Sequence, residues 1–159
     1  MNINDFIKQH VDEDDEVLDI GCGNKGRSAN LKCKKVITLD AWANVEPDIL
    51  IDLEIKDLPF EESSFDVVLL IDIIEHFEKN RGKEILRQAK LITKRVLLLL
   101  TPLWWQDNSI NVENPELWCY GNKHDYHKSL WTNDDFKGFE YTNYSTYEGN
   151  YFLGAWYSG

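Results

Sequence analysis

The chain has 159 residues, 43% of them hydrophobic, and its 28 acidic against 17 basic side chains give a net charge of −11. We expect a single domain over residues 1–159, long enough to bury a core. The negative charge disfavours nonspecific nucleic-acid binding, and no apolar run approaches the roughly 20 residues of a membrane span. The N-terminus lacks a signal-peptide pattern. Cys22, Cys33 and Cys119 show no paired spacing, which predicts free thiols and a cytoplasmic location.

The first two thirds of the chain predict strands that alternate with helical or loop segments. Apolar residues at helical spacing cover 3–11, and an interrupted helical stripe covers 73–93, with a break expected at Asn80-Arg81-Gly82. Most of the expected strands are continuous β-branched or leucine-rich runs, typical of strands buried on both faces. These strands are 16–20, 35–39, 48–52, 65–71 and 95–101. The alternation indicates a parallel α/β sheet with right-handed connections.

The last third differs in composition, because most of the Phe, Trp and Tyr residues follow Thr101. Residues 104–128 predict a long loop, and long loops in compact domains often cover binding sites. Four of its aromatic side chains could cover a flat or sugar-like ligand or could equally fill the core. They are Trp104, Trp105, Trp118 and Tyr120.

Two further elements are expected near the C-terminal end. Residues 132–136 predict a helical turn capped by Thr132 or Asn133. The runs 139–147 and 151–156 are rich in aromatic residues and threonine, and a Gly-Asn junction separates them. They predict an antiparallel hairpin.

The most informative segment is 17–26, where an apolar strand runs into Gly21-Cys22-Gly23-Asn24-Lys25-Gly26. Glycines at 21 and 23 let the backbone approach a ligand that a Cβ atom would exclude. Asp19 lies near the end of this strand, and Asp40 ends the next one. A carboxylate in the second position can accept hydrogen bonds from ribose hydroxyls. The pattern predicts a site for a nucleoside-bearing cofactor and hence an enzyme.

The same glycine segment satisfies the GxGxxG pattern, so a nicotinamide-dependent oxidoreductase is an alternative. Residues 27–32 leave at most a helical stub, whereas a dinucleotide pyrophosphate rests on the N-terminus of a full helix. Asp19 would also repel a phosphate and attract an ammonium or sulfonium group. The residues therefore favour a cationic ligand over a dinucleotide.

Several motifs in order resemble those of class I S-adenosylmethionine-dependent methyltransferases. Val17 to Gly23 resembles the first motif of that family, Leu39-Asp40 its ribose-binding acid, and Asp72 to Phe77 its signature after the fourth strand. Further matches are Asp52-Leu53-Glu54, Leu58-Pro59-Phe60, 64–68, Thr101-Pro102 and 127–132. The resemblance covers about residues 15 to 157. Its short segment between the first two strands is similar to a compact subgroup of the family.

The resemblance implies an α/β, Rossmann-like fold: a mostly parallel seven-stranded sheet with an antiparallel C-terminal hairpin and helices on both sides. It implies S-adenosylmethionine as the cofactor. Asp19 would meet the methionine amine, Asp40 the ribose, and Asp52 with Leu53 the adenine. Glu54 is a rival of Asp52, because it stands at the more common spacing before Leu58. The full set of implied cofactor positions is Asp19, Gly21, Cys22, Gly23, Asp40, Ala41, Asp52, Leu53 and Asp72.

The catalytic residues stay open at this point. Methyl transfer to a nucleophile requires mainly alignment and exclusion of water, and a base only where the acceptor must lose a proton. Candidates for that base are His124 and His127, with Asp125 and the more distant Asp107 beside them. Two histidines three residues apart in a loop do not establish a metal site, so no metal is assigned. His76 is expected to be structural or to line the pocket.

The acceptor is not defined by the sequence either. A small molecule, a glycan precursor or a protein side chain is compatible with it. No Asn/Asp-Pro-Pro-aromatic sequence follows the fourth strand, which disfavours an amino group of DNA or glutamine. The long loop, the N-terminal helix or a protein partner would select the acceptor. A non-catalytic, methyltransferase-like binding subunit is the alternative to an enzyme.

Overall fold

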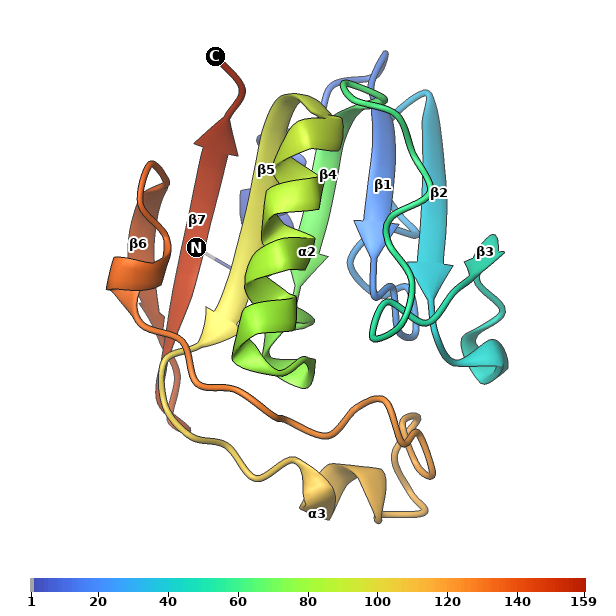
Figure 1. The fold of residues 1–159 in the computed structure, drawn as a ribbon, viewed down its shortest axis with the longest axis vertical. Coiled ribbons are helices and arrows are strands. Elements are labelled where there is room, and N and C mark those ends of the chain that lie inside the picture. Colours follow the sequence, from blue (N-terminus) through green and yellow to red (C-terminus); the bar gives the residue numbers. More distant parts are fainter. Residues whose placement is uncertain (1) are drawn as a thin grey trace.

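The computed structural model describes residues 2–159, and its strands form one seven-stranded sheet (Figure 1). The strands are β1 (Glu16–Ile20), β2 (Lys35–Asp40), β3 (Ile49–Leu50), β4 (Phe65–Ile71), β5 (Thr93–Pro102), β6 (Glu140–Ser145) and β7 (Asn150–Tyr157). The α-helices are α1 (Ile3–Lys8), α2 (Lys79–Ile92) and α3 (Ser109–Val112), and the 3₁₀ helices are η1 (Ala43–Val45), η2 (Ile74–His76) and η3 (Asn133–Asp135).

The sheet has the order β3-β2-β1-β4-β5-β7-β6. Strands β1 to β5 pair in parallel, whereas β7 runs antiparallel to both β5 and β6. The mostly parallel seven-stranded sheet with an antiparallel C-terminal hairpin is therefore confirmed. Because β1, β2, β4 and β5 point the same way, their carboxyl ends share one edge of the sheet, at the bottom of Figure 1.

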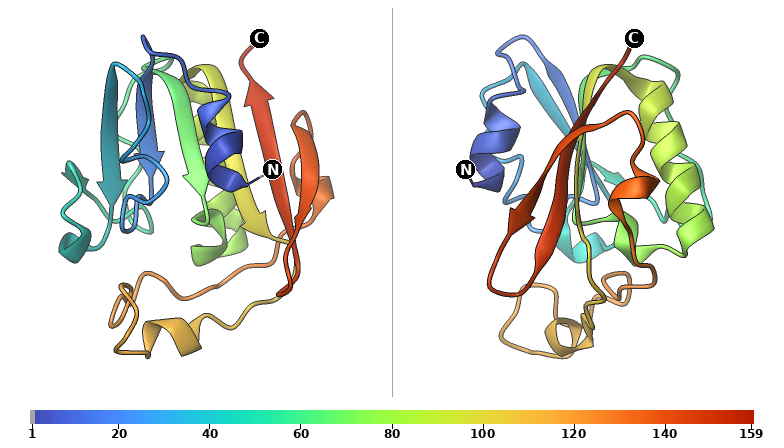
Figure 2. Two further views of the ribbon diagram at one scale, coloured as in Figure 1. Left: turned by 180° about the vertical axis from the view of Figure 1, so that it is seen from behind. Right: turned by 90° about the vertical axis from the view of Figure 1, so that its left-hand side faces the viewer.

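Apolar side chains fill both faces of the central strands, as the continuous hydrophobic runs predicted. Along β4, Val68 and Leu70 belong to the core under α2, while Val67 and Leu69 belong to the core under α1. Figure 2 shows α1 and α2 on opposite faces of the sheet. None of the helices within residues 2–159 has the length and apolar character needed to cross a membrane.

The predicted boundaries hold for β1 and β4 and shift elsewhere. Helix α1 ends at Lys8 instead of Val11, because His10 Nδ1 lies 2.8 Å from the Phe6 carbonyl that the His10 amide would use in a longer helix. Strand β3 contains only Ile49–Leu50. The carboxylate of Asp48 accepts from the Thr38 amide (2.8 Å), which ends the strand at that side.

The helical break predicted at Asn80-Arg81-Gly82 is wrong. The interruption lies before Lys79, between η2 and α2, and Gly82 is a buried residue of α2. A Cβ atom at Gly82 would lie 2.6 Å from Trp131 Cζ2 and 3.2 Å from the Ile74 carbonyl oxygen. Glycine is therefore required at 82 for close packing against Trp131 and does not interrupt the helix.

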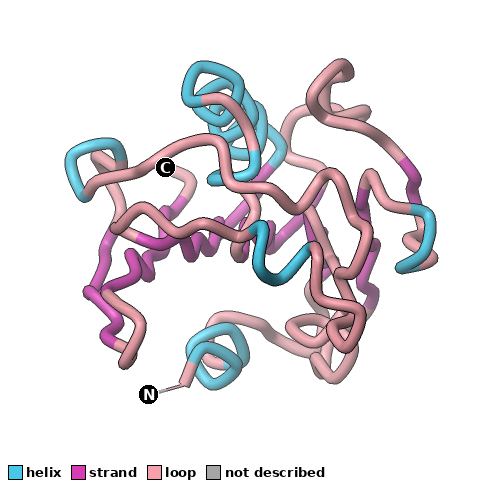
Figure 3. The backbone as a smooth tube through the Cα atoms, turned by 90° about the horizontal axis from the view of Figure 1, so that it is seen from below, coloured by secondary structure: helices cyan, strands magenta, loops and turns pink. Residues whose placement is uncertain are grey.

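The segment between β5 and the hairpin crosses the carboxyl edge of the parallel strands. This long loop, residues 103–131, includes α3 and lies across that edge in Figure 3. The capped turn predicted after it is confirmed as η3, where Asp135 Oδ2 accepts from the Thr132 amide (2.9 Å). The predicted hairpin is confirmed as β6 and β7.

We expect Gly82→Ala to destabilise the protein, although alanine favours an isolated helix by about 1 kcal/mol. The new methyl group would overpack the contact with Trp131, which typically costs about 1–3 kcal/mol. Urea denaturation would measure the free energy of unfolding, with Asn80→Ala as the control, because Asn80 is exposed in the same turn. An unchanged or higher free energy of unfolding in Gly82→Ala would contradict the packing argument.

Candidate functional site

A cavity of about 500 Å³ opens at the carboxyl ends of β1, β2 and β4, beneath the long loop. The chain order of the strands reverses between β1 and β4, which is where α/β sheets usually bind ligands. All nine positions predicted to hold a cofactor line this one cavity, as do Glu54, His124 and His127. The structure thus brings the predicted residues together, and their contacts with a ligand stay a prediction.

The glycine turn after β1 presents bare backbone to the cavity. Gly21 and Gly23 have φ values of +70° and +49°, a region that side chains disfavour. The amides of Gly21 and Cys22 donate to the Leu39 carbonyl (2.8 and 3.1 Å), which fixes the turn against β2. A Cβ atom at Gly23 would lie 2.8 Å from Trp118 Cη2, so the long loop reaches over the turn.

Asp40 is held in place by the backbone on both sides of the cavity. Its Oδ2 accepts from the Gly23 amide (3.0 Å) and its Oδ1 accepts from the Trp42 amide (2.9 Å). Each carboxylate oxygen has room for a further donor. Asp40 can therefore accept from two neighbouring hydroxyl groups without leaving its position.

Asp19 lies beneath the glycine turn and is only 2% exposed. Burial raises the pKa of its carboxyl group to about 6 from an ordinary value of 3.8. Its Oδ2 accepts from the Ser28 hydroxyl (2.5 Å), which lowers that pKa and partly offsets the burial. Ser28 lies in the short connection between β1 and β2, and no sequence signal indicated this contact.

The two acids after β3 differ in their partners. Asp52 Oδ1 accepts from the Glu54 amide (3.0 Å) and so caps its own turn. The carboxylate of Glu54 contacts the Lys128 ammonium. Within residues 2–159 no hydrogen bond reaches Asp52 Oδ2, so Asp52 retains more capacity to bind a polar ligand than Glu54 does.

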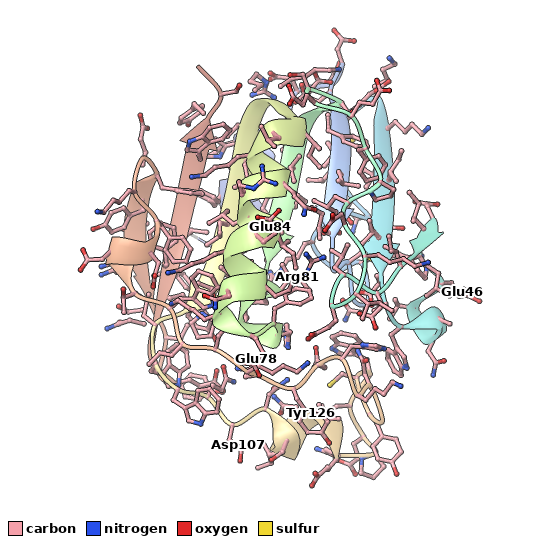
Figure 4. All side chains as sticks on the ribbon, in the orientation of Figure 1. Glu46, Glu78, Arg81, Glu84, Asp107 and Tyr126 are labelled. Carbon is pink, nitrogen blue, oxygen red and sulfur yellow. The ribbon has the colours of Figure 1, made fainter. Side chains whose placement is uncertain are left out.

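Arg81, which the sequence reasoning missed, ties this segment to α2. Its Nε donates to the Leu53 carbonyl (2.6 Å) and its Nη2 to the Lys56 carbonyl (2.5 Å). Figure 4 shows Arg81 on α2, facing the neighbouring loop. These bonds set the position of the Leu53 backbone at the cavity wall.

The wall beyond β4 is rich in buried ionisable groups. Asp72 adopts a φ of +53°, and burial raises the pKa of its carboxyl group to about 6. Burial and the neighbouring Asp72 raise the pKa of Glu75. Burial lowers the pKa of both His76 and His127 to about 4. At neutral pH both imidazoles are therefore uncharged.

The candidate bases of the long loop separate into two groups. His124, Asp125 and His127 line the cavity, whereas Asp107 is exposed and accepts from the Ser109 amide (3.0 Å) outside it. Asp107, expected to be the more distant candidate, therefore lies outside the cavity (Figure 4). Asn108, which lines the cavity, donates to the Asp125 carbonyl (2.6 Å) and fixes this part of the loop.

The four aromatic side chains of the loop also separate. Trp118 lines the cavity, and Trp104 packs edge-on against Tyr151 with 4.8 Å between the ring centroids. Trp105 and Tyr120 are more than half exposed. Only Trp118 contributes to a cover over the site.

The comparisons with known proteins agree with this geometry. Residues 18–96 match the family described as a methyltransferase domain. No curated protein matches the chain in sequence. The PH0226 protein from Pyrococcus horikoshii OT3 superposes with a TM-score of 0.64 at 14% identity, over 99% of this chain and 88% of that chain.

Two further solved structures show the same fold. A SAM-dependent methyltransferase from Methanosarcina mazei has a TM-score of 0.60 at 18% identity, over 98% of this chain and 96% of that chain. The 1,6-didemethyltoxoflavin-N1-methyltransferase from Burkholderia thailandensis was solved with 1,6-didemethyltoxoflavin and S-adenosylhomocysteine. It has a TM-score of 0.66 at 10% identity, over 98% of this chain and 76% of that chain.

The sequence match and the fold both confirm the predicted resemblance to class I S-adenosylmethionine-dependent methyltransferases. S-adenosylmethionine, the cofactor that the motifs predicted, is the cofactor of this family. The cavity fits that molecule, because a bare glycine turn and a doubly accepting Asp40 lie beside carboxylates that favour a cation.

The raised pKa of Asp19 predicts a pH-dependent affinity for S-adenosylhomocysteine, which carries an ammonium group. The ionised carboxylate attracts this group and the protonated form does not, so affinity should fall below pH about 6, by up to about tenfold per pH unit. Calorimetry at a series of pH values would measure it. In Asp19→Asn the decline should be smaller, and an affinity independent of pH in the unaltered chain would contradict the assignment.

Proposed function

We propose that the chain transfers a methyl group from S-adenosylmethionine to an acceptor that enters beneath the long loop. The observation that carries this proposal is Asp40, which two backbone amides hold against the bare turn with its remaining acceptors free. A ribose carries two adjacent hydroxyl groups that match this arrangement. In this assignment Asp40 binds the ribose.

The remaining cofactor contacts follow from position around the cavity. Asp19 lies beneath the turn and would hold the methionine amine, while Asp52 and the Leu53 backbone would hold the adenine. When bound, S-adenosylmethionine supplies a methyl carbon activated by a positively charged sulfur. Carboxylates around the cavity, including Asp72, favour that charge because opposite charges attract more strongly where water is excluded.

The loop residues would orient the acceptor and limit access of water. Trp118 covers the glycine turn, and Asn108 fixes the segment that carries Asp125 and His127. Because burial lowers the pKa of His127 to about 4, it is a weak proton acceptor, and His124, which also lines the cavity, is the proposed base for an acceptor that must lose a proton. A small molecule, a glycan precursor or a protein side chain is the proposed acceptor class, selected by the long loop, by α1 or by a partner protein.

Replacing Asp40 with alanine should weaken binding of S-adenosylhomocysteine by at least about 100-fold. Two hydrogen bonds to a charged group contribute at least about 3 kcal/mol together. Isothermal titration calorimetry would measure the affinity, and Asp14→Ala would serve as the control, because Asp14 is exposed far from the cavity. Equal affinities of the two variants, with both folded by circular dichroism, would refute the ribose contact.

Catalysis is a separate question from cofactor binding. We expect the chain to transfer labelled methyl groups from S-adenosylmethionine to at least one component of a lysate from its source. Transfer by the unaltered chain and not by Asp40→Ala would identify the acceptor by its label. Cofactor binding without transfer to any component would instead support a non-catalytic subunit, and stabilisation by NADH alone would support an oxidoreductase.

A further inference from the structure

A second group of polar side chains lies in the same cavity, next to the positions assigned to the cofactor. Glu75 and His76 belong to η2, directly after β4, and His127 belongs to the long loop. One carboxylate oxygen and two imidazole nitrogens of these residues all lie within 4.8 Å of one another. The two rings meet edge to face, with 4.8 Å between their centroids.

These distances are close to those around a bound metal ion. Bonds of about 2.1 Å place the ligand atoms of one ion roughly 3 to 4 Å apart. Small side-chain rotations would therefore close the set around an ion. Glutamate oxygen and imidazole nitrogen together suit divalent first-row transition metals.

Arg27 lines the same cavity as Glu75, but no ion pair joins the two side chains within residues 2–159. Glu75 is 1% exposed, and the Thr101 hydroxyl donates to its Oε2 (3.0 Å). Among the ion pairs of residues 2–159, none joins Glu75 to a lysine or arginine. Asp72 and Asp125 line the same part of the cavity. Buried carboxyl groups are protonated, paired or bound to metals, so a metal ion would take the place of a proton on Glu75.

Main-chain carbonyl groups fix the orientation of the His76 ring. His76 Nε2 lies 3.1 Å from the Asp72 carbonyl, and its Nδ1 lies 3.4 Å from the Tyr126 carbonyl. A neutral imidazole has a single N–H, so one of these nitrogens keeps a lone pair. Metal-bound histidines typically donate their other N–H to a carbonyl or carboxylate in this way.

The backbone holds the two halves of the group together. The amides of Lys128 and Ser129 donate to the Glu75 carbonyl (2.8 and 3.2 Å), so the chain beside His127 is attached to η2. Asp72, four residues before His76, adopts the left-handed backbone conformation, which side chains take up at a cost. The proximity of the three ligands therefore follows from fixed main-chain contacts.

We propose that Glu75, His76 and His127 bind a divalent first-row transition-metal ion at the wall of the cavity. The sequence assigned no metal, and the set considered there, within residues 124–127, shares only His127 with this one. The remaining coordination positions open into the cavity, where they would take an oxygen ligand. For methyl transfer, on which this step rests, that ligand would be a hydroxyl group of the acceptor.

The test is binding of Mn²⁺ and of Zn²⁺ to the full chain after treatment with a chelator. We expect one ion per chain by equilibrium dialysis, and electron paramagnetic resonance would report the bound Mn²⁺. His127→Ala should weaken binding by at least about 100-fold, because changes even to residues behind a ligand cost 10–100-fold. His10→Ala is the matched control, since His10 Nδ1 contacts the Phe6 carbonyl of α1 and His10 does not line the cavity.

The outcomes separate the metal site from the proposed function. If neither ion binds stoichiometrically, or if His127→Ala binds as tightly as the unaltered chain, the metal proposal is overturned. S-adenosylhomocysteine should bind to His127→Ala, which also establishes that this variant is folded. Its failure to bind to the unaltered chain would refute the proposed function and leave the metal result standing. Glu75→Gln gives a second variant, with the same loss of metal expected.

Discussion

The excess of negative charge at the carboxyl ends of β1, β2 and β4, where seven acidic side chains and one arginine, Arg27, line the cavity, is the constraint on which the site depends. Asp19 and Asp72 are acids whose pKa burial raises to about 6, and Glu75 is buried more deeply still. Taking carboxylates out of water destabilises a protein unless a partner compensates them. A cationic ligand would supply that partner. The carboxylates that lower the stability of the fold would then contribute to the affinity for the ligand.

Backbone geometry determines where such a ligand can lie. Parallel strands deliver Asp19, Asp40 and Asp72 to one edge of the sheet, and the left-handed turn at Gly21 and Gly23 presents main-chain atoms to the cavity between the side chains of Ile73 and Trp118. Asp40 joins these features, because it accepts from the turn and still faces the cavity. Affinity and shape thus originate from the same few residues after β1 and β2.

The connection between β1 and β2 is short and contains no helix, and the long loop supplies part of the cavity wall. Residues 21–34 form turns instead of a helix, yet Ser28 from this segment still reaches Asp19. The opposite wall comes from the loop after β5, where Trp118 covers the turn and His127 meets η2. Enclosure of the site therefore depends on a segment with little regular structure of its own, held by Asn108 and by the Glu75 carbonyl.

The sequence by itself determined the strands, the turn and the acids at the strand ends, because these signals are local: apolar runs set β1 and β2, Gly21 follows β1, and Asp40 ends β2. It misplaced the helical break, since the need for glycine at 82 comes from Trp131, far along the chain. Only the tertiary structure paired Ser28 with Asp19 and brought His127 to Glu75. Those contacts join segments that no periodicity links, and they exist because packing across the sheet edge fixes both partners.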